Sequence, residues 1–175
     1  QTFLFSTLAW FMVAVFGSLP FLLSASEFTL SEAFFESMSG ITTTGATIIS
    51  DLDNSPKSIL LWRAIMQWLG GIGIVVMAIT ILPLLKVGGM QLFKMEGPDS
   101  TEKILPRTIQ VATIIISTYI ALTFFCGLFY WIFGMTIFDS ICHAMTTIAT
   151  GGFSTHNDSI GFFKNSNIEI IASIF

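Results

Sequence analysis

The chain has 175 residues, of which 53% are hydrophobic and only 10% are charged, with a formal net charge of −4. A soluble domain carries about 25% charged residues, so this chain has too few charges to cover its surface in water. The composition therefore predicts an all-α integral membrane protein surrounded by lipid, and with no basic run it gives no reason to expect a nucleic-acid partner.

Four apolar stretches follow one another along the chain as candidate membrane-spanning helices, each measured against the roughly 20 residues that a bilayer requires. They are residues 2–23, 59–85, 109–133 and a stretch that begins at Ile168. The chain starts without Met and stops inside the last stretch, so we expect it to be a segment of a longer protein.

Two further apolar stretches, residues 30–41 and 138–148, have the length of short helices that cannot cross a bilayer. Ser31 is the predicted N-cap of the first. Each short helix leads into a segment rich in Thr and Gly, residues 42–47 and 149–155. Irregular backbone at membrane depth is tolerated only where protein buries it or where it lines a water-filled path, so both segments are predicted to be re-entrant.

The loop of residues 86–107 carries four of the seven basic residues: Lys86, Lys94, Lys103 and Arg107. By the positive-inside rule this loop is predicted to be cytoplasmic, which places both short helices on the outer side. The predicted organisation is a first pore repeat at residues 1–85, the cytoplasmic loop at 86–107, and a second pore repeat at 108–175 with an incomplete last span.

The two halves of the chain form an internal repeat that aligns without a gap. Residue 38 aligns with residue 145, an offset of 107 residues, and the same offset pairs Ile41 with Ile148, Thr43 with Thr150, and Gly45 with Gly152. Each repeat contains two spans, so both repeats have the same orientation and are related by an axis along the membrane normal. Repeats placed about such an axis enclose a central path.

The Thr/Gly segments have the chemistry of a cation filter. Backbone carbonyl oxygens can replace the hydration shell of a monovalent cation, and glycine permits backbone angles that turn successive carbonyls to one side. The C-terminal end of each short helix would add a partial negative charge. The alternative for Gly45 and Gly152 is that they are turn glycines that end helices, and for the threonines that they make local hydrogen bonds.

The segments GITTTGAT, WRAIMQWLGGIGIVVMAITILPLL, KVGGMQLFKMEGPD and AMTTIATGGFST resemble the Trk/Ktr/HKT superfamily of potassium transporters over essentially the whole chain. The resemblance implies a potassium-channel-like pore of four helix–re-entrant-loop–helix repeats, with K⁺ as the transported ion and no organic cofactor. It also implies a homodimer in the bacterial inner membrane and a cytoplasmic nucleotide-binding regulatory partner. The filter residues that it implies are Thr42, Thr43, Thr44, Gly45, Ala149, Thr150, Gly151 and Gly152.

Two rival functions stay open. A K⁺ symporter coupled to H⁺ or Na⁺ needs an ionisable residue at membrane depth, for which the candidates are Glu32, Glu36 and Asp139. A non-conducting scaffold could dock a cytoplasmic regulator through residues 86–107. No catalytic constellation is apparent, so we do not expect an enzyme.

Several side chains could have either a structural or a functional role. Arg63 and Gln67, four residues apart on one helix face, could snorkel to the interface or brace a re-entrant loop through a carboxylate such as Glu36. His143 is interpreted as a packing residue behind the filter. Three glycines are expected to allow close helix packing: Gly70, Gly71 and Gly73. The thiols of Cys126 and Cys142 are expected to be packing groups. Three carboxylates predicted to lie on the outer side would attract cations or simply be solvated: Asp51, Asp53 and Asp158.

Overall fold

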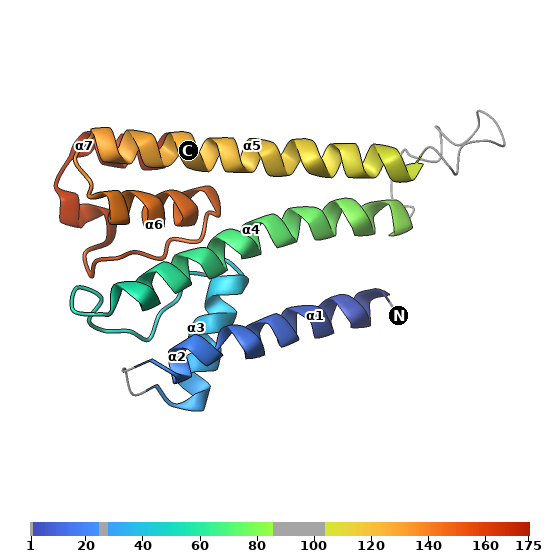
Figure 1. The fold of residues 1–175 in the computed structure, drawn as a ribbon, viewed down its shortest axis with the longest axis horizontal. Coiled ribbons are helices and arrows are strands. Elements are labelled where there is room, and N and C mark those ends of the chain that lie inside the picture. The colour runs from blue at the N-terminus through green and yellow to red at the C-terminus, as the bar shows by residue number, and fades with distance from the viewer. Residues whose placement is uncertain (1, 25–27, 86–103) are drawn as a thin grey trace. The chain divides into compact units, whose positions relative to one another are not determined.

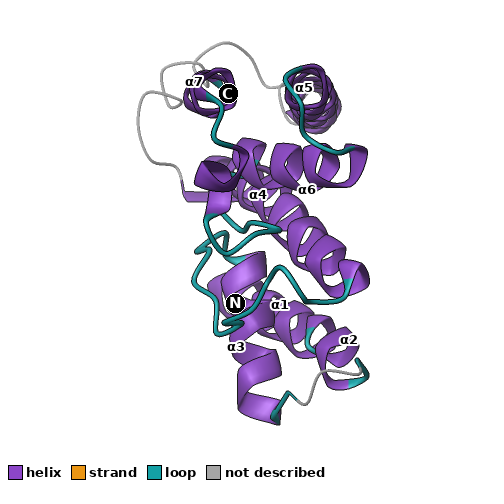
Figure 2. Cartoon of the chain, turned by 90° about the vertical axis from the view of Figure 1, so that its left-hand side faces the viewer, coloured by secondary structure: helices purple, strands orange, loops and turns teal. Residues whose placement is uncertain are grey.

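The computed structural model describes residues 2–24, 28–85 and 104–175, and within these ranges the regular elements are all helical (Figure 1, Figure 2). The all-α prediction is therefore confirmed. In chain order the elements are α1 (Thr2–Gly17), α2 (Leu19–Leu22), α3 (Leu30–Ile41), α4 (Lys57–Leu85), α5 (Ile104–Ile132), α6 (Ile137–Ile148), the 3₁₀ helix η2 (Ser159–Phe163) and α7 (Ser166–Ile174).

Three described stretches are long and apolar enough to cross a membrane: Leu4–Leu22, Lys57–Met77 and Gln110–Ile132. The first was predicted as a spanning helix over residues 2–23, and within it α1 ends at Gly17 and α2 begins at Leu19. Pro20 accounts for the break, because proline lacks the amide hydrogen and its ring clashes with the carbonyl four residues earlier. Large apolar side chains remain open on α1, such as Leu4 at 76% and Phe5 at 75% exposure, as expected of a helix that faces lipid or other membrane helices.

The chain forms two compact units, one of residues 1–71 and 122–175 and the other of residues 72–121. The first unit contains every predicted filter residue. The second consists of the adjoining parts of α4 and α5. Residues 86–103, most of the predicted cytoplasmic loop, lie outside the described residues.

Both short helices begin with the same type of cap, and the predicted cap was wrong by two positions. The N-cap of α3 is Thr29 rather than Ser31. The Thr29 hydroxyl accepts a hydrogen bond from the Glu32 amide at 3.3 Å, and the Glu32 carboxylate accepts one from the Thr29 amide at 2.8 Å, which is a capping box. Thr136 caps α6 by accepting from the Asp139 amide at 3.2 Å. Ser31 is already inside the helix, where its hydroxyl cannot serve as the cap.

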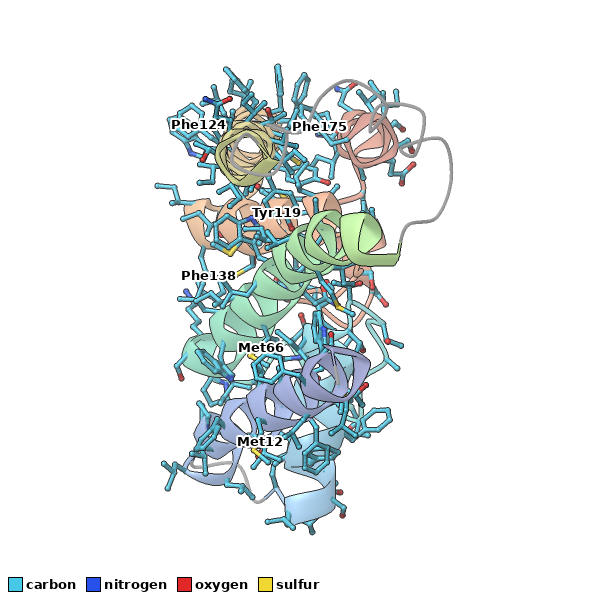
Figure 3. The ribbon with its side chains drawn as sticks, turned by 90° about the vertical axis from the view of Figure 1, so that its right-hand side faces the viewer. Met12, Met66, Tyr119, Phe124, Phe138 and Phe175 are labelled. Carbon is cyan, nitrogen blue, oxygen red and sulfur yellow. The ribbon has the colours of Figure 1, made fainter. Side chains whose placement is uncertain are left out.

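The short helix α3 is packed against longer apolar helices. It lies beside α1 and α2 (Figure 1). Buried Ala14 of α1, Ile41 of α3 and Met66 of α4 form one cluster, and Figure 3 shows Met66 between α4 and α1. A second cluster joins α2, α3 and α4 through Phe21, Ala33 and Ile59. The C-terminal end of α3 is therefore held inside the unit.

The second short helix, α6, has a corresponding place in its own repeat. A buried cluster joins Cys126 and Tyr130 of α5, Ala144 of α6 and Ile168 of α7. Cys126 and Cys142 are both free and buried, which confirms that they are packing residues. As with α3, the packing fixes the end of α6 from which a Thr/Gly segment departs.

Candidate functional site

The two Thr/Gly segments share an unusual backbone conformation at matched positions. Thr43 has a φ of 55° and Gly45 a φ of 77°, while Thr150 has 53° and Gly152 has 78°. A positive φ is uncommon for a non-glycine residue and is an outlier for a β-branched one such as Thr. Such strain persists only where the surroundings over-determine it, and it clusters at functional sites.

Matched hydrogen bonds hold both segments to the helices that precede them. The backbone amides of each segment point back to carbonyls in the last turn of α3 or α6. The pairs are Thr42–Met38 (3.0 Å) and Ala149–Met145 (3.1 Å), Thr43–Gly40 (2.9 Å) and Thr150–Thr147 (2.9 Å), and Thr44–Ser39 (3.0 Å) and Gly151–Thr146 (2.9 Å). The repeat inferred from the sequence thus extends to individual backbone hydrogen bonds.

The carbonyl oxygens of the segments stay available for a ligand. Within the described part of the chain, none of the carbonyls of residues 42–45 and 149–152 accepts a hydrogen bond. The hydroxyls of Thr42 and Thr44 are engaged locally, with each other at 2.8 Å and, from Thr42, with the Met38 carbonyl at 2.7 Å. The hydroxyl protons of Thr42 and Thr44 are thus used locally, while the carbonyls of both segments remain free acceptors.

The two segments touch each other at their glycines. A Cβ added to Gly45 would overlap the carbonyl oxygen of Gly151, whereas one added to Gly152 would meet nothing within 4 Å. Gly45 and Gly152 both line a cavity of about 280 Å³, which continues along the chain past Thr47 and Ser154. Two segments separated by more than a hundred residues in sequence thus form one continuous surface of backbone.

Glycine also brings the helix that follows the first segment close to it. A Cβ on Gly70 of α4 would overlap the backbone of Ile41, at the end of α3. The prediction that Gly70 allows close helix packing is therefore confirmed.

A buried ion pair lies behind the first segment. Arg63 Nε donates to Glu36 Oε1 at 2.7 Å, and the two side chains are 1% and 0% exposed. Of the two alternatives left open for Arg63, the structure shows the pairing with Glu36 and contradicts snorkelling to the interface. The same Glu36 carboxylate accepts hydrogen bonds from the Thr47 hydroxyl at 2.8 Å and the Ile48 amide at 3.1 Å, just after Gly45.

His143 is the counterpart of Glu36 at the offset of 107 residues, a pair that the sequence analysis did not predict. It is buried, and its Nε2 lies 3.4 Å from the Ser154 hydroxyl and 3.3 Å from the Thr155 hydroxyl, just after Gly152. The interpretation of His143 as a packing residue behind the segment is confirmed. In both repeats, therefore, the same helix position braces the residues that follow the glycine.

The loops that follow the two Thr/Gly segments are also tied together. His156 Nδ1 lies 2.6 Å from Asp53 Oδ1, and the Leu52 amide donates to Asn157 Oδ1 at 2.8 Å. Nothing in the sequence pattern pointed to His156 as a link. Asp51 is exposed, and hydrogen bonds from the side chain and amide of Asn54 lower the pKa of its carboxyl, so that it stays ionised at neutral pH.

The three carboxylates considered for ion coupling each have a structural partner. Glu32 closes the capping box of α3, and Glu36 is paired with Arg63. Asp139 accepts from the hydroxyls of Thr136 at 2.6 Å and Thr155 at 2.7 Å.

Comparison with known proteins identifies the family. The whole chain, residues 1–175, matches the family described as TrkH, cation transport protein. The chain is 48% identical over 178 residues to the Trk system potassium uptake protein TrkH of Escherichia coli K12, covering all of this chain and 37% of that protein. It is 46% identical over 176 residues to the protein of the same name from Vibrio parahaemolyticus, covering 99% of this chain and 36% of that one.

A solved structure agrees with these sequence matches. The crystal structure of the potassium transporter TrkH from Vibrio parahaemolyticus superimposes with a TM-score of 0.85 at 42% identity, over 99% of this chain and 34% of that one. The chain thus spans about a third of the length of these relatives. It is a membrane protein that belongs to the TrkH family of cation transport proteins, a family of transporters rather than enzymes.

Proposed function

We propose that the chain forms two neighbouring pore repeats, residues 1–85 and 108–175, of a protein that takes up potassium across the bacterial inner membrane. Residues 86–107 would lie in the cytoplasm and the Thr/Gly segments on the outer side. The names of the relatives, which are potassium uptake proteins, support this assignment. The rest of the full-length protein would supply the remaining repeats.

In the proposed mechanism, K⁺ sheds its water and binds to backbone carbonyls of Thr42, Thr43, Thr44 and Gly45, and of the matched residues 149–152. Carbonyl dipoles fixed at the positions of the lost water oxygens offset the cost of dehydration. The C-terminal ends of α3 and α6 lead into the segments and add partial negative charge. No transition metal or organic cofactor enters this mechanism.

The observation that carries the proposal is the repeated pair of positive φ angles, at Thr43 and Gly45 and again at Thr150 and Gly152. A turn that merely ended a helix would need one such residue. Two in each segment, one of them a strained threonine, with unbonded carbonyls and direct contact between the segments, are what a shared carbonyl ring requires.

The structural partners of Glu32, Glu36 and Asp139 support a pore over a coupled symporter. A coupling residue must exchange its proton or ion during each cycle, and each of these carboxylates is held in a cap, an ion pair or a pair of hydroxyl contacts. A scaffold would leave the strained, matched segments without a role. As the resemblance implies, we propose a homodimer that binds a TrkA-like cytoplasmic nucleotide-binding subunit.

The test is uptake of Rb⁺ and K⁺ by the full-length protein in cells that lack their own potassium uptake, with Na⁺ as competitor. Saturable uptake that discriminates against Na⁺ is the expected result. If the protein reaches the membrane and cells supplied with the cytoplasmic subunit still show no uptake, the proposal is wrong and the scaffold becomes the better reading.

A further inference from the structure

A single polar network on α4 reaches both candidate filter segments. We propose that Arg63 and Gln67 are positioning residues for the filter, which hold the residues after Gly45 and those after Gly152 in one fixed arrangement. This inference rests on the proposed function, because it assigns the two side chains a part in ion selection.

The arm to the first segment passes through Glu36. Arg63 Nε bonds the Glu36 carboxylate at 2.7 Å, and that carboxylate holds the Thr47 hydroxyl at 2.8 Å and the Ile48 amide at 3.1 Å. The contacts lie two and three residues beyond Gly45. Any displacement of the guanidinium is therefore transmitted to the end of the first segment.

The arm to the second segment is direct. Arg63 Nη1 donates to the Ser154 carbonyl at 3.2 Å, and Gln67 Oε1 accepts from the Phe153 amide at 3.1 Å. The Arg63 guanidinium also lies over the Phe153 ring, 4.1 Å from its centroid. The Gln67 amide lies so close to Gly151 that a Cβ at this glycine would overlap it.

Burying the polar groups of Arg63 and Gln67 costs free energy, which is expected only where these groups have a specific role. Arg63 is 1% exposed and Gln67 is fully buried, yet one nitrogen of each, Nη2 and Nε2, has no hydrogen-bond partner. Arg63 is paired with Glu36, but the cost of desolvating a buried ion pair can exceed the attraction between its charges. Apolar side chains of similar volume would pack α4 without these orphaned donors, but they could not bind backbone groups of the second segment.

The network is present at one boundary between repeats and not at the equivalent place of the next repeat. At the offset of 107 residues, Arg63 corresponds to Ile170 and Gln67 to Ile174. These isoleucines lie on α7 and are 55% and 74% exposed. The brace within each repeat recurs, as Glu36 and His143, whereas the polar link from one segment to the next does not. The polar link that Arg63 and Gln67 make from α4 is therefore not repeated by the residues at the matched positions of α7.

The experiment uses the full-length protein in cells without their own potassium uptake, and it measures the preference for Rb⁺ over Na⁺ per molecule in the membrane. Gln67→Leu removes the acceptor for the Phe153 amide. Arg63→Lys keeps the charge but replaces the planar guanidinium with a single ammonium. The guanidinium bonds Glu36 and the second segment at the same time, and the ammonium cannot reproduce both bonds in that geometry. Each should lower the preference about fivefold or more, the loss expected for one buried hydrogen bond.

Trp62→Phe is the matched control. Trp62 is the neighbour of Arg63 on α4, and its Nε1 donates to the Gly17 carbonyl at 3.0 Å, away from the filter segments. This variant also loses one hydrogen bond, so it should lower the amount or thermal stability of the protein without changing the preference. If Trp62→Phe changes the preference as much as Gln67→Leu, or if Gln67→Leu and Arg63→Lys both keep the wild-type preference, the inference is overturned.

Gly152→Ala, measured alongside, separates this inference from the proposed function. If Gly152→Ala lowers the preference and the α4 variants do not, the filter stands and the positioning role fails. If none of these variants changes the preference, the filter assignment itself fails. Should Gln67→Leu not accumulate in the membrane, Arg63→Lys tests the same link between α4 and the two segments, and its ion preference decides whether the positioning role holds.

Discussion

The contact between the two segments predicts unequal effects for one substitution made at two matched glycines. Gly45 and Gly152 have φ angles of 77° and 78°, so alanine at either position is forced into the left-handed region. That conformation costs about 1–2 kcal/mol for an L-residue. If the whole cost is relieved by turning a filter carbonyl, the preference for K⁺ over Na⁺ falls by about 5- to 30-fold.

The surroundings of the two glycines differ although their backbones match. At Gly152 the new methyl group meets nothing within 4 Å, so Gly152→Ala should reach the membrane and transport with reduced preference. At Gly45 it would overlap the Gly151 carbonyl, whose carbon would lie 3.0 Å away, and approach Gln67 Nε2 at 3.5 Å. Backbone cannot move aside cheaply, so Gly45→Ala should abolish uptake or prevent accumulation.

The assay is Rb⁺ uptake with Na⁺ competition, normalised to the protein present in the membrane. Gly161→Ala in η2 is the control, because its φ is not positive and a Cβ there meets nothing within 4 Å. Uptake by Gly45→Ala equal to that of Gly152→Ala would refute the contact between the segments. Wild-type preference in Gly152→Ala would refute the role of its backbone angle.

Three further substitutions test the supports of the segments. Thr29→Ala removes the cap of α3 and should cost about 0.5–2 kcal/mol, seen as a lower midpoint of thermal unfolding in detergent; an unchanged midpoint would argue against the cap. Gly70→Ala should greatly reduce accumulation in the membrane, measured by immunoblot, because its methyl would overlap the Ile41 backbone, and normal accumulation would contradict that close packing. Tyr130→Phe loses the 2.9 Å contact with the Thr147 hydroxyl and should cost about 0.5–1.5 kcal/mol with unchanged ion preference, whereas altered preference would extend the filter's supports to α5.

Much of the fold could be predicted from the sequence because a bilayer leaves few options. Apolar stretches of about 20 residues or more specify spans, and the stretches of 11 and 12 residues between them cannot cross. The offset of 107 residues then located both Thr/Gly segments and matched Gly45 with Gly152. The bounds of α3, residues 30–41, were predicted correctly, but its N-cap was misassigned because Thr29 and Ser31 are both good caps, and only the reciprocal contact with Glu32 decides between them.

The contacts between repeats could not be predicted in the same way. Spacing along one helix indicated that Arg63 and Gln67 share a face, but not that these side chains bond residues 91 and 86 positions later in the chain. The positive φ of Thr43 was equally hidden, because threonine is among the residues least expected to adopt it. The link from His156 to Asp53 joins two loops whose separation in space has no sequence signature.

Because the repeats are joined in one chain, matched positions of the site can carry different residues, which is impossible for identical subunits. In a symmetric ring of identical chains, a residue at one boundary occurs at every boundary. In this chain the positions that carry Arg63 and Gln67 in the first repeat carry Ile170 and Ile174 in the second, so matched helix positions are polar and buried in one repeat and apolar in the other. A filter needs several carbonyls held at matching distances. The contacts that hold these carbonyls in place need not be equally strong in every repeat. In the proposed filter, the matched φ angles present the two segments to the ion in the same conformation, whereas the polar link through Arg63 and Gln67 gives them different surroundings in the protein.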